Sequence, residues 1–136
     1  MTSADRAPAY PLGLGFRDAV HSATGIAASE LTLERVLDGE LGPDDVRVGP
    51  ETLLLQAGFA EQGGNPQLAE NLRRGAELCA FTDDELLRFY DTLRPGRATA
   101  EEMDALADQL TARGAGRCAA LVREARAAYV RRGLIQ

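Results

Sequence analysis

Two copies of one helix-start pattern constrain the fold of this 136-residue chain more than any other feature. Thr82 is followed three residues later by Glu85, and Thr99 is followed three residues later by Glu102. In this pattern, the capping box, each side chain bonds a backbone N–H that the first turn of a helix leaves without a partner. The second box comes just after Pro95-Gly96, a pair that ends a helix. The sequence therefore predicts two consecutive helices joined by a short turn.

Proline and glycine divide the rest of the chain in the same way. A short helix is expected within 31–40 and ends at Gly39, while Pro50 and Pro66 each begin a longer helix. Leucine and alanine supply most of the apolar residues, which recur every three or four positions. We expect an all-α fold, a small bundle of about five to six short helices, with no convincing strand and no internal repeat.

The same spacing predicts which side chains are buried. The expected stripes are Leu33, Val36 and Leu37 in the first helix; Leu68, Leu72, Ala76 and Cys79 in the helix from Pro66; Leu86, Leu87, Tyr90 and Leu93 in the next; Met103, Leu106, Ala107 and Leu110 in the helix after it; and Cys118, Leu121, Val122, Ala125 and Tyr129 in the last, which follows a break at 113–117.

Residues 1–30 have neither the helical nor the strand period. The stretch "RAPAYPLGLGF" mixes proline, glycine and isolated apolar residues, which predicts an extended N-terminal arm at 1–30 ahead of a helical domain at 31–136. A solvated arm does not need Tyr10, Leu12, Leu14 and Phe16. These side chains either fold back on the chain's own core or lie on a partner chain, and the residues alone leave both alternatives open.

Composition excludes several classes of function. The net charge of −6 argues against a nucleic-acid-binding protein, which usually has a basic face. The chain contains no lysine, which excludes a lysine Schiff base or a phosphate-loop lysine. Cys79 and Cys118 are far apart in the sequence and are expected to be reduced and half-buried. No apolar run has the length of a signal peptide or a membrane span, so we expect a cytoplasmic protein with no membrane partner.

No catalytic, cofactor-binding or metal-binding constellation is found. His21, the only histidine, lies in the arm without a cysteine nearby, and adjacent side chains in an extended arm point apart, so Ser22 is not its nucleophile. Asp44-Asp45 fits a turn, and Asp83-Asp84 fits the first turn of a helix, where negative charge is favourable. The last helix is rich in arginine and the segment 30–51 is rich in acids, so the two either face each other or meet a partner chain.

Four ordered segments resemble the small (gamma) subunit of coenzyme-B12-dependent diol and glycerol dehydratases. They are "LTLERVLDGELGPDDVRVGPETLLLQA", "LAENLRRGAEL", "TDDELLRFYDTLRPGRATAEEMDALADQL" and "CAALVREARAAYVRR". The resemblance extends back through "YPL" and "VHSATG" and covers nearly everything from Tyr10 to Arg132. Together "VRVGPETL" and "YDTLRPGRAT", in this order, are quite specific.

The resemblance implies a non-catalytic subunit of a carbon–oxygen lyase. In that family a large barrel subunit holds the diol and a metal ion, adenosylcobalamin lies between the large and medium subunits, and the complex is a dimer of heterotrimers. We therefore expect a small subunit that supports assembly of a propanediol dehydratase, which converts 1,2-propanediol to propanal. The alternatives are a glycerol dehydratase small subunit, whose complex makes 3-hydroxypropanal, and a stand-alone helical adaptor.

The resemblance also gives the apolar arm and the Pro95-Gly96 turn a role. We expect no cofactor or metal on this chain, and we expect an interface with the other subunits at Tyr10, Pro11, Leu12, Phe16, Arg94 and Arg97. The two arginines either hold the turn or bind a carboxylate of the large subunit, rather than a small anion. Family members tend to carry an aromatic residue at the position of Gly96. Only nine residues precede Tyr10, so packaging in a bacterial microcompartment is expected to depend on another subunit.

Overall fold

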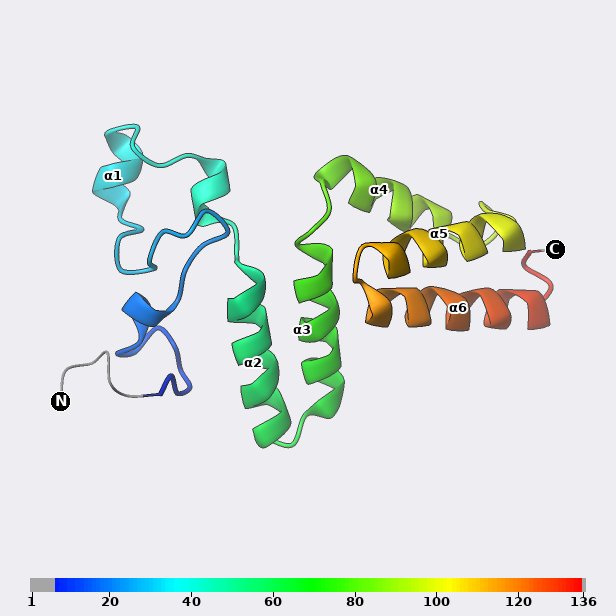
Figure 1. The fold of residues 1–136 in the computed structure, drawn as a ribbon, viewed down its shortest axis with the longest axis horizontal. Coiled ribbons are helices and arrows are strands. Elements are labelled where there is room, and N and C mark those ends of the chain that lie inside the picture. Colours follow the sequence, from blue (N-terminus) through cyan, green and yellow to red (C-terminus); the bar gives the residue numbers. More distant parts are fainter. Residues whose placement is uncertain (1–6, 136) are drawn as a thin grey trace. The chain divides into compact units, whose positions relative to one another are not determined.

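The chain folds into short α-helices joined by turns (Figure 1). A computed structural model describes residues 7–135. Within these residues the elements are the 3₁₀ turn η2 (Arg17–Ala19), α1 (Leu33–Leu37), the 3₁₀ turn η3 (Pro43–Val46), α2 (Pro50–Gln62), α3 (Pro66–Leu78), α4 (Asp83–Thr92), α5 (Ala100–Ala112) and α6 (Gly116–Arg131). The only β pairing in the described chain is two isolated bridges, His21 with Ala27 and Ser22 with Val48. The expected all-α fold is confirmed.

Both capping boxes form as the sequence predicts. The Thr82 hydroxyl accepts the Glu85 N–H at 3.3 Å, and the Glu85 carboxylate accepts the Thr82 N–H at 2.8 Å. The corresponding distances in the second box, between Thr99 and Glu102, are 3.2 Å and 2.8 Å. Gly96 has a φ of +74°, a conformation that other residues rarely adopt. The turn therefore requires glycine at the position where the resemblance led us to expect an aromatic residue.

The chain divides into two compact units, Met1–Leu72 and Arg73–Gln136, so the boundary falls inside α3. We call them unit 1 and unit 2. The division into an arm at 1–30 and a helical domain at 31–136 stays a prediction, because compactness groups the arm with the first two helices.

Unit 2 has a well-formed apolar core. α5 and α6 lie side by side, and α4 packs against α5 (Figure 1). The expected stripe of α5 is buried throughout, and Met103 at its centre is completely inaccessible to solvent. Cys118 and Val122 are buried on the facing side of α6, although Leu121 is half-exposed. The buried members of this core are Phe81, Phe89, Met103, Leu106, Ala107, Leu110, Ala115, Cys118, Ala119 and Val122.

The predicted stripe of α4 is wrong at two positions. Leu87 and Tyr90 are largely exposed, and Phe89 is buried in their place. Phe89 packs edge-on against Phe81, with ring centroids 5.2 Å apart. Leu86, Phe89 and Leu93 also recur every three or four residues, so periodicity alone did not separate the two faces. The partner ring of Phe81, which precedes the helix, decides between them.

Two smaller predictions also need correction. Leu68 of α3 and Cys79, which directly follows the helix, are exposed, and Ala69 is fully buried instead of Leu68. The last helix begins at Gly116 rather than after residue 117, because its first amides find an acceptor outside the helix. The Glu77 carboxylate of α3 accepts the backbone N–H of Arg117 at 3.0 Å and that of Cys118 at 2.9 Å. A residue 40 positions earlier in the chain thus caps α6.

Unit 1 is held together largely by polar contacts. The Thr24 hydroxyl donates to Asp45 at 2.8 Å, and the buried Ser22 hydroxyl lies 3.1 Å from that of Thr24. The Thr52 hydroxyl, at the start of α2, donates to the backbone carbonyl of His21 at 3.4 Å. These bonds attach the second half of the arm to η3 and to α2. The buried apolar side chains of this unit are few, and two of the four are alanines: Phe16, Leu41, Ala57 and Ala69.

Candidate partner interface

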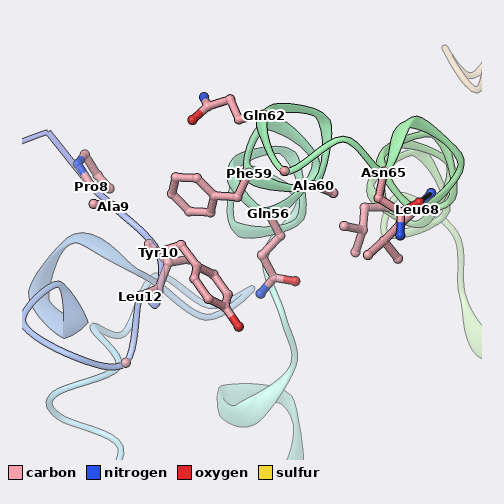
Figure 2. A pocket seen from close by; sticks show the side chains of 13 residues that line it. Pro8, Ala9, Tyr10, Leu12, Gln56, Phe59, Ala60, Gln62, Asn65 and Leu68 are labelled. Carbon is pink, nitrogen blue, oxygen red and sulfur yellow. Dashed lines mark hydrogen bonds between the residues drawn. The ribbon is translucent and has the colours of Figure 1, made fainter.

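The first half of the arm lies against α2. The Tyr10 ring packs edge-on against Phe59, with ring centroids 6.3 Å apart (Figure 2). The Tyr10–Pro11 peptide bond is cis, and the Leu14 N–H donates to the Pro11 carbonyl at 3.0 Å, which closes a turn. Even so, 80% of Tyr10 remains exposed. The arm therefore contacts its own unit but leaves an aromatic surface open.

An apolar groove of about 900 Å³ lies between the arm, α2 and the first half of α3. Tyr10 of the arm lies beside Gln56 and Phe59 of α2 on one side of it (Figure 2). Leu68 and Leu72 of α3 form the opposite wall, with the amides of Gln62 and Asn65 nearby. Leu68 was expected to be buried in the apolar stripe of α3, but its side chain is exposed and lines the groove. Apolar walls with a few amides suit the side chains of another polypeptide.

The predicted arm residues differ in accessibility. Tyr10 and Pro11 are exposed and Leu12 is half-buried at the groove, whereas Phe16 is buried in its own unit. Leu14 is exposed and does not line the groove. Phe16 thus supports the arm, and the accessible surface is formed by the residues ahead of it. Their contact with a partner stays a prediction.

Arg94 and Arg97 lie in unit 2, at the turn between α4 and α5. The Arg94 guanidinium lies 3.5 Å from the Asp91 carboxylate, one turn earlier in the chain. The Arg97 N–H donates to the Arg94 carbonyl at 3.1 Å, so the backbones of the two residues close the turn. Both side chains are exposed. The turn forms through backbone bonds, which leaves the two guanidinium groups largely in solvent.

The arginines of α6 have acidic partners within unit 2. Arg123 pairs with Asp108 at 3.1 Å, and Arg126 pairs with Asp104 at 3.0 Å. Both acids belong to α5, so the acidic segment 30–51 is not needed to balance these charges. Within that segment, Arg35 pairs with Glu40 at 2.8 Å.

Two partly buried carboxylates act as backbone caps. The Gly42 N–H, which donates to Asp45 at 2.7 Å, lowers the pKa of that carboxyl, and the Thr24 hydroxyl lowers it further. In the same way the Thr82 N–H lowers the pKa of Glu85, and the Arg113 guanidinium adds to the effect. Asp45 thus confirms the interpretation of Asp44-Asp45 as turn chemistry.

The two thiols have different environments. Cys79 is exposed directly after α3, whereas Cys118 is buried, and neither is part of a disulfide. Burial raises the pKa of the Cys118 thiol to about 12, and the neighbouring Glu77 carboxylate also raises it. The Cys118 thiol is therefore protonated at neutral pH.

No group of three or more His, Cys, Asp or Glu side chains is placed to hold a metal ion within residues 7–135. The contacts of His21 are made by its backbone. It forms an isolated β-bridge with Ala27, and its carbonyl accepts a hydrogen bond from the Thr52 hydroxyl, while the residue itself is exposed. Over the same residues, no helix is both long and apolar enough to span a bilayer.

Sequence reasoning missed the most exposed apolar groups outside the arm. Leu33 and Leu37 of α1 and Leu87 and Tyr90 of α4 were all expected to be buried, and all four are more than half exposed. A stripe pattern shows which face of a helix is apolar, but the same pattern results when that face meets another chain. The shortness of α1 was the one available signal that its leucines are exposed, because a helix of five residues buries little apolar area in any core.

Comparison with known proteins supplies what the geometry leaves open. A family model described as dehydratase small subunit matches residues 6–136. The chain belongs to this family of dehydratase small subunits. Two relatives, both called propanediol dehydratase small subunit, come from Citrobacter freundii and Salmonella typhimurium. Each is 45% identical over 124 residues, which cover 90% of this chain and 72% of the relative.

As a dehydratase small subunit, the chain is part of a larger enzyme, and the resemblance first seen in its ordered segments is confirmed. The exposed apolar arm, the groove and the apolar face of α1 are features that a protein with partners is expected to have. Their number also explains why a chain of this length buries few large side chains outside unit 2.

Proposed function

We propose that this dehydratase small subunit serves an adenosylcobalamin-dependent diol dehydratase that converts 1,2-propanediol to propanal. The observation that carries the proposal is the 45% identity, over 90% of this chain, to two propanediol dehydratase small subunits. The substrate and cofactor are those of the family that the ordered segments resemble. In this proposal the enzyme complex acts in the cytoplasm. It is either free there or packaged in a bacterial microcompartment through one of the other subunits.

The proposal assigns the chemistry to the partner subunits. A large barrel subunit holds the diol and a metal ion, adenosylcobalamin lies between it and a medium subunit, and two such heterotrimers form the complex. This chain supplies no catalytic, cofactor-binding or metal-binding residue. Its contribution is to stabilise the assembly through apolar contacts, for which the exposed arm provides a surface.

Co-expression with the large and medium subunits tests this function. The chain is expected to co-purify with both, and the complex is expected to form propanal from 1,2-propanediol when adenosylcobalamin is added. Glycerol assayed in parallel distinguishes a diol dehydratase from a glycerol dehydratase. A chain that purifies alone as a well-behaved monomer, beside partner subunits that are fully active without it, would contradict the proposal.

The arm gives the proposal a specific contact. We expect the double substitution Tyr10→Ala and Leu12→Ala to weaken assembly more than it lowers the melting temperature of the isolated chain. Tyr10 is mostly exposed, so its removal costs the free chain little, whereas an aromatic anchor in an interface often contributes more than about 2 kcal/mol. The opposite ranking would mean that the arm serves its own unit.

The exposed arginines of the α4–α5 turn are proposed to bind a carboxylate of the large subunit. We expect Arg97→Ala to weaken assembly without changing the stability of the isolated chain, because the turn forms through the backbone of this residue. Arg97→Lys keeps the charge and is the matched control, although it loses the forked geometry of the guanidinium. An equal effect on the free chain would assign Arg97 to the turn instead.

A further inference from the structure

Helix α1 places its apolar side chains in solvent. Leu33 and Leu37 are 73% and 76% exposed and Val36 is 46% exposed, and no residue of the helix is buried. In contrast, only 34% of the Arg35 side chain is exposed. Residues 33, 36 and 37 share one helix face and residue 35 lies on the opposite face. The two leucines of the helix thus lie in solvent, and Arg35 on the opposite face is the more buried side chain.

Polar contacts at its two ends hold α1 in this orientation. The Thr32 hydroxyl accepts the Arg35 N–H at 3.4 Å. The Arg35 guanidinium bonds the Glu30 carbonyl at 3.2 Å on one side and pairs with Glu40 at 2.8 Å on the other. The buried Leu41 follows directly. A five-residue helix is too short to be stable by itself, so these contacts, rather than the leucines, define its position.

Two acidic side chains border the leucines. Glu34 and Asp38 are one turn apart on the flank of the apolar face, and both are exposed. Neither carboxylate forms an ion pair within residues 7–135. If a second copy of the chain packed on this face about a twofold axis, it would bring these like charges together, which opposes association. The charge therefore favours a partner surface that is apolar in the middle and positively charged at its edge.

We propose that α1 is a docking element that inserts Leu33 and Leu37 into an apolar, arginine- or lysine-edged surface of another subunit of the same dehydratase. This proposal rests on the proposed function, because it takes the partner from the complex. A five-residue helix covers only a small part of the 1,200 Å² or so that a stable interface buries. The partner is therefore a large folded surface that also contacts other parts of the chain, rather than a short peptide.

Competition during co-expression tests this assignment. Wild-type and variant chains that carry different tags are expressed together with the large and medium subunits, and their ratio in the purified complex is measured. We expect Leu33→Ser with Leu37→Ser to be incorporated at least about tenfold less than wild type, as for the loss of anchoring side chains. We expect Glu34→Arg with Asp38→Arg to lower incorporation at least about threefold, and the complex that forms to dissociate faster at low salt than the wild type.

The double variant Leu87→Ser with Tyr90→Ser is the matched control, because it removes from α4 two apolar groups that are also more than half exposed. It is expected to be incorporated like the wild type. Equal incorporation of the α1 variants and the wild type, or an equal loss in the control, would overturn the proposal. The isolated chain could instead form a dimer that the double substitution Leu33→Ser and Leu37→Ser dissociates. In that case a second copy of the chain would occupy the α1 face, which also overturns the proposal. A wild-type chain that enters no complex would instead contradict the proposed function.

Discussion

Helix α5 of unit 2 and helix α1 of unit 1 both carry apolar side chains at helical spacing, yet only α5 buries them. The stripe of α5 meets the facing side of α6 and the aromatic rings of Phe81 and Phe89. The stripe of α1 meets solvent, and its helix is held by a threonine cap and the ion pairs of Arg35. Helix α5 therefore stabilises its own unit, whereas α1 keeps apolar surface available for contact with other chains.

Replacing the centre of the unit 2 core gives the largest expected effect. Met103→Ala should lower the free energy of unfolding by about 3 kcal/mol, because Met103 is fully buried and alanine leaves a cavity. Urea denaturation of the full chain measures the change. Leu87→Ala on the exposed face of α4 is the control, with an expected change within about 0.5 kcal/mol. A similar loss of unfolding free energy in both variants would mean that Met103 does not lie at the centre of the core.

The cap that α3 provides for α6 is expected to contribute less. Glu77→Ala leaves the N–H groups of Arg117 and Cys118 without their acceptor, and we expect a loss of about 1–2 kcal/mol. Glu77→Gln keeps one side-chain oxygen and should lose less than the alanine variant. Denaturation midpoints of the two variants provide the measurement. An alanine variant as stable as the wild type would show that water replaces the carboxylate at no cost.

A smaller effect is expected from pH, and it has the same sign in both units. Hydrogen bonds lower the pKa of Glu85 in unit 2 and of Asp45 in unit 1 relative to the unfolded chain. Their stabilisation is complete above the unfolded-state pKa values, about 4.3 for Glu and 3.9 for Asp, and is lost as the pH falls through the lower folded-state values. Glu85→Gln and Asp45→Asn should therefore each reduce the acid sensitivity of unfolding. Melting curves between neutral pH and acid pH measure it, and an unchanged acid sensitivity would rule out the contribution.

The smallest effect on the free chain is expected at α1. Leu33→Ala with Leu37→Ala should change the free energy of unfolding by no more than about 0.5 kcal/mol, because both side chains are already in solvent. Thermal or urea unfolding of the full chain without its partners measures this change. A loss as large as that of Met103→Ala would remove the contrast between the two units.

Local signals allowed most of the fold to be predicted from the sequence. The caps Thr82 and Thr99, and the first positions Pro50 and Pro66, mark helix starts through contacts within a few residues, which any sequence displays directly. The side chains of α4 were not predictable in the same way, since two overlapping stripes fit the period and the ring of Phe81 selects one. The capping of α6 by Glu77 was hidden as well, because it links residues far apart in the chain.

Only part of the candidate interface could be predicted from the sequence. The proline- and glycine-rich stretch pointed to the surface around Tyr10, but composition did not separate the exposed Tyr10 from the buried Phe16. The arginines were found because they flank a visible helix break. The exposed leucines of α1 were predicted to be buried in the chain's own core. A sequence shows that a helix face is apolar, but it does not show which molecule covers that face.

The capping of α6 by Glu77 has a consequence for how opening of unit 2 can be observed. The first amides of a helix usually exchange their hydrogen with solvent quickly, because they lack a partner within the helix. Those of Arg117 and Cys118 are bonded to a carboxylate of α3, which is lost when α3 and α6 separate. Their exchange rates are therefore expected to follow the global unfolding of unit 2, which makes two residues at a helix end reporters on the whole unit.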